Sequence, residues 1–130
     1  MVIVARHDTG RRFMATAGEY TIFAGKAEDN PERNGMWPGS LFIAALGMCI
    51  VGDIVPFCQR HDIPTEDLTV ELDVTAAQNP ARVDNVAVTI RLPQEVAPAQ
   101  QQAIVRAAAQ CYIHQSIVNN MGITISVSAP

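Results

Sequence analysis

The stretch that decides the fold is PGSLFIAALGMCIVGDIVPFCQR, from Pro38 to Arg60. From Leu41 to Cys58 every residue is apolar or small except Asp53. A helix of this composition has no polar face, which is typical of a helix inside a protein core. Because Asp53, Pro56 and two glycines interrupt the run and strand-like segments follow it, the sequence favours a buried core helix over a membrane span.

A helix that is apolar on all sides needs extensive cover. The chain has 130 residues, which predicts a single domain over residues 1–130. We expect a sheet to cover part of the helix and a second subunit to cover the rest. Ser40 is expected to cap the first turn, and Pro56 is expected to kink or break the last one.

Composition excludes some classes of partner. The chain is 48% hydrophobic and 17% charged, with a formal net charge of -4. This balance provides no electrostatic footprint for nucleic acid or for an anionic membrane surface. The opening MVIVARHD does not resemble a secretory signal, and three cysteines do not form a secreted disulfide framework. We therefore expect a cytoplasmic protein with reduced thiols.

Segments of alternating polarity surround the long helix and predict strands. They begin at Val2 and Val4 and continue over residues 12–16, 19–24, 68–75, 86–92 and 123–128. A second helix is predicted over residues 99–110, with Ile104, Ala108 and Cys111 on its inner stripe. The order is two or three strands, a helix, two strands, a helix and a strand. This order predicts an α+β domain with antiparallel sheets.

Two of the three cysteines are candidates for chemistry. Cys58 follows Cys49 by nine positions on one helix, half a turn out of phase, so these two cannot meet and Cys58 is expected to be structural. Cys111 is expected to point inward from the second helix. If the two helices cross at Cys49 and Cys111, their Cα atoms would lie about 4–6 Å apart, close enough for a disulfide.

A metal site is not predicted from the sequence. Cys111 and His114 lie close together in the chain, but His7, His61 and Asp53 stand at no recognisable ligand spacing from them. Asp53, one turn beyond Cys49, could be a polar partner of that thiol. The alternative is a hydrogen-bonded structural or interface carboxylate.

Two motifs resemble those of a known family. The segments PGSLFIAALGMC, residues 38–49, and AQCYIH, residues 109–114, are similar to the two cysteine motifs of the OsmC/Ohr family. The order of elements agrees over nearly the whole chain, and the short OsmC-like branch is the most similar. The resemblance implies an OsmC-like fold and an intertwined homodimer, with long helices packed at its centre and active sites at the subunit interface.

The resemblance also implies a function in oxidative-stress defence. Members with activity reduce organic hydroperoxides. Cys49 would be the peroxidatic thiol and Cys111 the resolving thiol, and a small dithiol such as a lipoyl group would reduce their disulfide. No metal or organic cofactor is implied.

The family activates its peroxidatic thiol with an arginine from the amino-terminal strands. Arg11 or Arg12 would match it. The family's glutamate that holds this arginine would fall at Gly39, which has no side chain. Asp53 and Glu32 are the candidates to replace it.

The apolar character of the long helix favours bulky organic peroxides as substrates. The residues expected to line the binding site are Phe42, Leu46, Met48 and His114, which stands where the well-studied peroxidases have a small residue. Two alternatives remain: a non-catalytic dimer that binds a small hydrophobic ligand or senses redox state, and a structural protein with inert cysteines.

Overall fold

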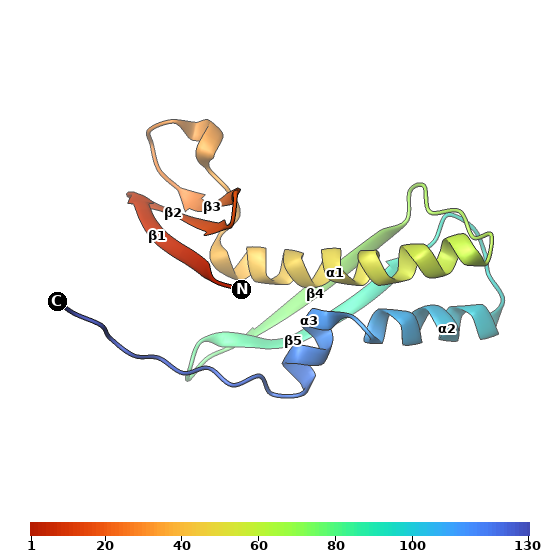
Figure 1. Ribbon diagram of the computed structural model, residues 1–130. Coiled ribbons are helices and arrows are strands. Elements are labelled where there is room, and N and C mark those ends of the chain that lie inside the picture. The colour runs from red at the N-terminus through yellow and green to blue at the C-terminus, as the bar shows by residue number, and fades with distance from the viewer. The chain divides into compact units, whose positions relative to one another are not determined.

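The computed structural model describes all residues, 1–130, as two compact units that divide between Ala44 and Ala45. Each unit is described by itself below, and the prediction of a single domain stays a prediction. Figure 1 shows the elements of each unit: a small sheet in the first, and a hairpin with two helices in the second. The long helix begins in the first unit and ends in the second.

The first unit contains a three-stranded antiparallel sheet. Its strands are β1 (Ile3–Thr9), β2 (Arg11–Ala17) and β3 (Tyr20–Lys26), in the order β1-β2-β3. The β2–β3 hairpin turns at Gly18, whose φ of +58° lies in the left-handed region that glycine adopts without strain. The predicted amino-terminal strands are therefore confirmed.

The loop after β3 folds back onto that strand. It contains a short 3-10 helix, η1 (Pro31–Arg33). The Gly35 N–H donates to the Gly25 carbonyl at 2.9 Å, and the Gly25 N–H donates to the Met36 carbonyl at 2.8 Å. A Cβ atom on Gly35 would overlap the carbonyl oxygen of Phe23, so the close approach of loop and strand requires glycine there.

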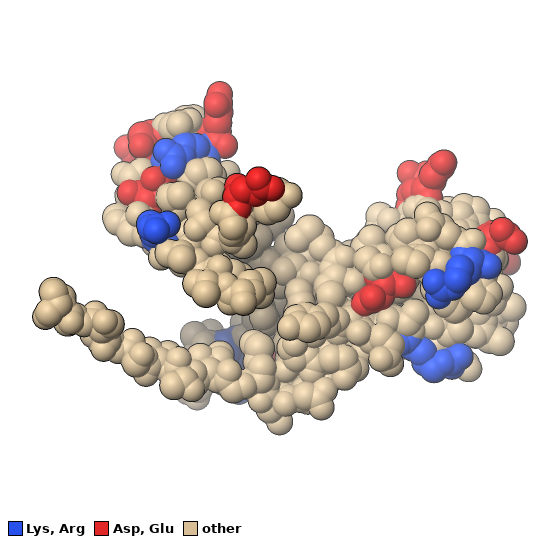
Figure 2. All heavy atoms as spheres, viewed as in Figure 1, with Lys and Arg blue, Asp and Glu red and all other residues tan.

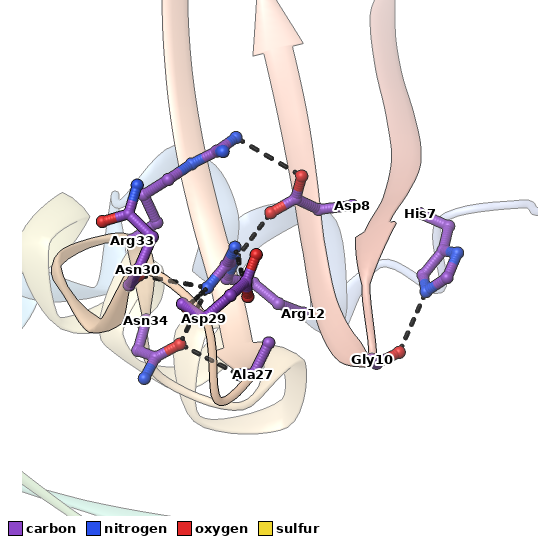
Figure 3. A network of polar contacts seen from close by, with 9 residues as sticks. All are labelled: His7, Asp8, Gly10, Arg12, Ala27, Asp29, Asn30, Arg33 and Asn34. Atoms are coloured by element: carbon purple, nitrogen blue, oxygen red, sulfur yellow. Dashed lines mark hydrogen bonds and ion pairs between the residues drawn. The ribbon is translucent and has the colours of Figure 1, made fainter.

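Arg12 is the polar centre of this unit and is fully buried (Figure 3). Its Nε donates to Asp8 at 2.6 Å, and one terminal nitrogen donates to the Asp29 carboxylate at 3.2 Å. The other terminal nitrogen donates to the carbonyls of Asp29 and Asn30 and to the side chain of Asn34. These bonds fix the loop against β2, because a buried guanidinium must have partners for its donors.

One expected carboxylate partner of the arginine, Glu32, is wrong for Arg12. Within the first unit Asp8 and Asp29 bind its guanidinium instead. The expected contact with Asp53, which belongs to the second unit, stays a prediction. Asp8 reaches Arg12 across the β1–β2 turn, and Asp29 is brought there by the loop. Both contacts depend on chain reversals that local sequence patterns do not specify.

The long helix α1 (Pro38–Arg60) begins earlier than its expected cap. The Leu41 N–H donates to the Trp37 carbonyl at 2.9 Å, so Ser40 lies within the first turn and its prediction as the cap is wrong. Proline fits the first helical position because that position needs no amide donor. The helix then continues through Pro56 without the expected break.

In the second unit, one stripe of α1 forms the core. Leu46, Ile50, Ile54 and Cys58 recur every four positions and are buried together. They pack against the inner residues of a hairpin made of β4 (Thr69–Ala77) and β5 (Arg82–Arg91). In this hairpin Val70 pairs with Ile90, Leu72 with Val88 and Val74 with Val86, as the predicted alternation requires.

Two further helices complete the core of this unit. The predicted second helix is α2 (Pro98–Ala109), and its Ile104 is buried against the α1 stripe. A third helix, α3 (Tyr112–Val118), follows at once and was not predicted. Cys111 lies between them and caps α3, because its sulfur accepts a hydrogen bond from the His114 N–H at 3.4 Å.

The opposite side of α1 is uncovered in a single chain. Met48 is 64% exposed, and Gly52, Asp53 and Pro56 are exposed as well. The helix is long and apolar enough to cross a membrane by length and composition, a property that core helices of soluble proteins share. The expectation that a sheet covers part of the helix is confirmed by the β4–β5 hairpin, and the expected cover by a second subunit stays a prediction.

The carboxyl-terminal tail differs from its prediction. Residues 122–130 form no strand, and Ile123, Ile125 and Val127 are 76%, 88% and 93% exposed. Figure 1 shows the tail as extended chain beyond α3. A strand exists only where a neighbouring strand supplies its hydrogen bonds, and none within this chain pairs with the tail.

The Arg12 network predicts a loss of stability in acid. The hydrogen bond from Arg12 is the largest cause that lowers the pKa of Asp8 below its ordinary value of 3.8. A depressed folded-state pKa stabilises the fold above the ordinary value, and this stabilisation disappears as the pH falls through the folded pKa. Asp8→Asn should therefore lower the melting temperature at neutral pH and reduce its dependence on pH below about 4.

The matched control is Glu19→Gln, since Glu19 is exposed in the β2–β3 turn and forms no ion pair. Thermal unfolding followed by circular dichroism across the acidic range measures both effects. Equal melting curves for Asp8→Asn and Glu19→Gln at every pH would contradict this role of Asp8.

Candidate functional site

The cysteine pair is the centre of the candidate site. The sulfur of Cys49 on α1 and the sulfur of Cys111 lie within 4.8 Å of each other, and both thiols are free. Cys49 is half-buried, whereas Cys111 is fully buried. In the sequence-based prediction, a disulfide depends on the approach of Cys49 and Cys111. The structure brings their two sulfur atoms together.

Burial and the neighbouring Cys49 determine the protonation state of the Cys111 thiol. Desolvation is the main cause that raises the pKa of the Cys111 thiol, and the hydrogen bond with Cys49 raises it further. The His114 N–H acts in the opposite direction because it stabilises a thiolate. The net result favours a protonated Cys111 thiol at neutral pH.

Cys58 has the environment of a structural cysteine. It lies in the core with no exposed surface, and burial raises the pKa of its thiol. A protonated thiol with no solvent access is a poor nucleophile. Cys111 is buried to the same extent, but it is grouped with Cys49 and Asp53 whereas Cys58 is not. The division between one structural cysteine and two reactive ones stays a prediction.

Asp53 lies beside the pair, as its spacing on the helix suggested. It follows Cys49 by one turn of α1, and its carboxylate lies within 4.8 Å of both sulfur atoms. Asp53 is exposed and makes no hydrogen bond or ion pair with another side chain. The site therefore combines two sulfurs and one carboxylate at an edge that is open to solvent.

The two candidate arginines belong to the first unit and have different environments. Arg12 is buried with its guanidinium bound by β1 and the loop. Arg11 is exposed, and its guanidinium carbon lies 4.9 Å from the centre of the Trp37 ring. A cation–π contact of this kind leaves the N–H donors free. The activation of Cys49 by either arginine stays a prediction.

The four predicted lining residues do not share one environment. Leu46 belongs to the core, whereas Met48 is exposed on the other side of α1. Phe42, in the first unit, is 42% exposed. His114 is half-buried on α3 and contacts Cys111 through its backbone N–H. Sequence reasoning missed this contact because α3 was not predicted and a cysteine is an uncommon helix cap.

The second unit also contains an open cavity of about 460 Å³ away from the cysteines. It is lined by residues of β5, of α2 and of the loop between them. Six of the ten lining residues are apolar, and the four polar ones are Thr89, Gln94, Glu95 and Gln101. A small hydrophobic molecule suits such a lining.

Charged groups are mixed on the surface. On the face drawn in Figure 2, acidic and basic side chains are interspersed on each unit and wide areas carry no charge. The mixture accords with the low net charge of the sequence. The chemistry of the site therefore rests on its sulfur atoms and on Asp53 rather than on a strongly charged surface.

Comparison with known proteins identifies the fold. A model of the OsmC-like protein family matches residues 29–126. No curated protein sequence matches the chain.

Three solved structures are informative. A protein of Psychrobacter arcticus 273-4 named for an osmotic stress and detoxification response is 21% identical, with a TM-score of 0.73 over 89% of this chain and 87% of its own. An organic hydroperoxide resistance protein OsmC of Legionella pneumophila is 20% identical, with a TM-score of 0.64 over 92% and 91%. The organic hydroperoxide resistance protein OhrB of Bacillus subtilis is 17% identical, with a TM-score of 0.61 over 92% and 93%.

These likenesses confirm the predicted fold class, an α+β arrangement with antiparallel strands around a long helix. The family match covers well over half of the residues and includes both cysteine motifs. This chain belongs to the OsmC-like family.

Proposed function

We propose that this protein reduces organic hydroperoxides with the Cys49–Cys111 pair. The observation that carries the proposal is the approach of the two sulfurs to within 4.8 Å in an OsmC-like fold. Two of the similar structures are organic hydroperoxide resistance proteins, which supports a stress-related redox function. The third cysteine, Cys58, is buried and takes no part.

Accessibility assigns the roles of the two thiols. Cys49 is half-buried and can meet a peroxide, whereas Cys111 has no exposed surface. The Cys49 thiolate attacks one peroxide oxygen, the O–O bond breaks, and an alcohol leaves after it takes up a proton. Cys49 is thereby oxidised to a sulfenic acid.

Cys111 then resolves the sulfenic acid. Its sulfur attacks the Cys49 sulfur, a disulfide forms, and water leaves with the proton of the Cys111 thiol. A disulfide requires sulfurs about 2.05 Å apart, so they must move together by less than about 3 Å. A small dithiol such as a lipoyl group returns the pair to two thiols and is itself oxidised to a disulfide. The cycle needs no organic cofactor.

An arginine is proposed to favour the Cys49 thiolate, and Arg11 is the better candidate. The guanidinium of Arg12 already binds Asp8, Asp29 and the loop, whereas Arg11 only stacks on Trp37. No side chain at Gly39 can hold the arginine in the family's way. The ring of Trp37 provides an alternative support.

The proposed assembly is a homodimer. Within one chain the α1 side that contains Met48 and Gly52 is uncovered, and the apolar tail has no strand to pair with. A second copy would cover both, since a helix without a polar face cannot remain in water at low cost. Three free thiols accord with the reducing cytoplasm as the proposed compartment.

A second candidate function is the binding of a small hydrophobic molecule. The cavity between β5 and α2 favours it because six of its ten lining residues are apolar and none is a cysteine. A chain with this function would show thermal stabilisation by an apolar ligand and thiols that peroxide oxidises slowly.

Three cysteine variants test the peroxidase. With cumene hydroperoxide and a dithiol reductant, Cys49→Ser should consume peroxide only at the background rate. Cys111→Ser should stop after one equivalent and leave a sulfenic acid on Cys49, detected by a sulfenic-acid reagent and mass spectrometry. Cys58→Ala is the control and should keep its activity, at a stability cost of about 1–2 kcal/mol for the small cavity.

Native consumption by Cys49→Ser, or normal turnover by Cys111→Ser, would contradict the proposed roles. No consumption by the folded native protein with reduced thiols would instead favour the hydrophobic-ligand function.

The two arginines are separated by a pair of matched variants. A nearby cation favours the thiolate form of a cysteine, so Arg11→Gln should reduce the rate with peroxide at neutral pH about tenfold or more. Arg12→Gln should instead lower the melting temperature, because it leaves Asp8 and Asp29 without their buried partner. Rates are compared per folded molecule. If Arg12→Gln reacts slowly with peroxide and Arg11→Gln reacts at the native rate, Arg12 rather than Arg11 activates Cys49.

The dimer is tested at Gly52. A Cβ atom there meets nothing within 4 Å in the single chain, so Gly52→Leu should preserve the fold of the monomer. If a second copy packs on this side of α1, the larger side chain should raise the dissociation constant of the dimer at least about tenfold. Sedimentation measures the constant, and Gln102→Leu on exposed α2 is the control. Equal dimerisation of both variants would place the interface elsewhere.

A further inference from the structure

The geometry points to a metal site at the cysteine pair: we propose that Cys49, Asp53 and Cys111 bind one Zn²⁺ ion when the thiols are reduced. The ligand atoms of these three residues lie within 4.8 Å of one another. A metal site at these residues was not predicted, because Cys111 is far from Cys49 and Asp53 in the chain and the three show no recognisable ligand spacing. The proposal rests on the same residues as the proposed peroxidase but requires no peroxide chemistry.

The donor set suits zinc. Zinc prefers thiolate sulfur and also accepts a carboxylate oxygen, usually in a tetrahedron. Zinc–sulfur bonds of about 2.3 Å place two sulfurs about 3.8 Å apart in a tetrahedron. Ligand atoms that already lie within 4.8 Å of one another need to move by about 1 Å or less to reach that separation.

The surroundings of the three ligands are consistent with one bound cation. Cys49 and Asp53 stand one turn apart on a rigid helix, so they present their side chains in the same direction. Cys111 is fixed in the core, and the His114 N–H donates a hydrogen bond to its sulfur, which orients this ligand. Asp53 has no ion-pair partner that would compete with the metal.

Three protein ligands leave the fourth tetrahedral position open. This position lies beside Asp53, which is exposed in the single chain, and water or a small thiol can complete the tetrahedron there. Each thiol that is protonated before binding releases its proton to solvent. The bound ion then offsets the negative charge of two thiolates and a carboxylate.

Metal and disulfide are mutually exclusive at this site. In an oxidation by an organic hydroperoxide, the two thiolates lose two electrons and form the disulfide. The peroxide takes up these electrons with two protons and leaves as an alcohol and water, while Zn²⁺ is released. Bound zinc would therefore mask the thiols until an oxidant removes them as ligands.

Titration of the full reduced chain with Co²⁺ under anaerobic conditions tests the site directly. One equivalent should produce thiolate-to-cobalt charge-transfer absorption with the strong visible bands of tetrahedral cobalt, and Zn²⁺ should displace it. Cys49→Ser and Cys111→Ser should lose the charge-transfer intensity in part and bind far more weakly. Asp53→Asn should weaken binding about 10- to 100-fold.

Two controls make the outcome specific. Cys58→Ala and Asp73→Asn, which alter a core thiol and an exposed strand carboxylate, should bind cobalt as the native chain does. Absence of thiolate–cobalt absorption in the folded reduced protein, or equal binding by Asp53→Asn and Asp73→Asn, would overturn the site as proposed. A chain that consumes peroxide without binding metal would overturn the metal site alone, and one that binds metal without consuming peroxide would overturn the peroxidase alone.

Discussion

The structure of the second unit depends on the packing of one stripe of α1 against the β4–β5 hairpin and α2. Leu46, Ile50, Ile54 and Cys58 form this stripe and are almost fully buried. The same contact fixes the depth and rotation of the helix, and with them the position of Cys49 beside Cys111. The candidate site is thus a consequence of core packing, since the stripe and Cys49 occupy adjacent faces of one rigid helix.

The first unit is organised around charge instead. Its sheet has few buried apolar side chains, and the guanidinium of Arg12 ties β1, β2 and the following loop together. A buried cation with carboxylate and carbonyl partners specifies one loop conformation, because any other leaves donors unsatisfied. Because the donors of Arg12 are already bound, the guanidinium of the neighbouring Arg11 is the more available of the two.

Elements with a local signal were predictable from the sequence. The alternation of Val70, Leu72 and Val74 marked β4, and the apolar run marked α1. The cap was missed because Pro38 begins the helix before Ser40, and α3 was missed because Cys111 ends one helix and caps the next. Both errors arise at helix ends, where the preferences for the first helical position and for the cap compete at neighbouring residues.

The candidate site was predictable only in part. The motifs singled out Cys49 and Cys111, but their approach depends on how separate elements pack, which no local pattern reports. The partners of Arg12 were not predictable for the same reason, since Asp8 and Asp29 reach it through turns of the chain. The tail had the alternation of a strand, yet a strand also needs a neighbour that the sequence of one chain does not guarantee.

The exposed tail has a further consequence for the newly synthesised chain, namely a risk of aggregation. Ile123, Ile125 and Val127 present a row of β-branched side chains on backbone whose hydrogen-bonding groups are free. Such a segment is a template for unspecific pairing with other chains and for aggregation. When few copies of the chain are present, each tail stays exposed for longer and has more time to pair unspecifically. The yield of soluble protein should therefore depend on how soon the tail is covered.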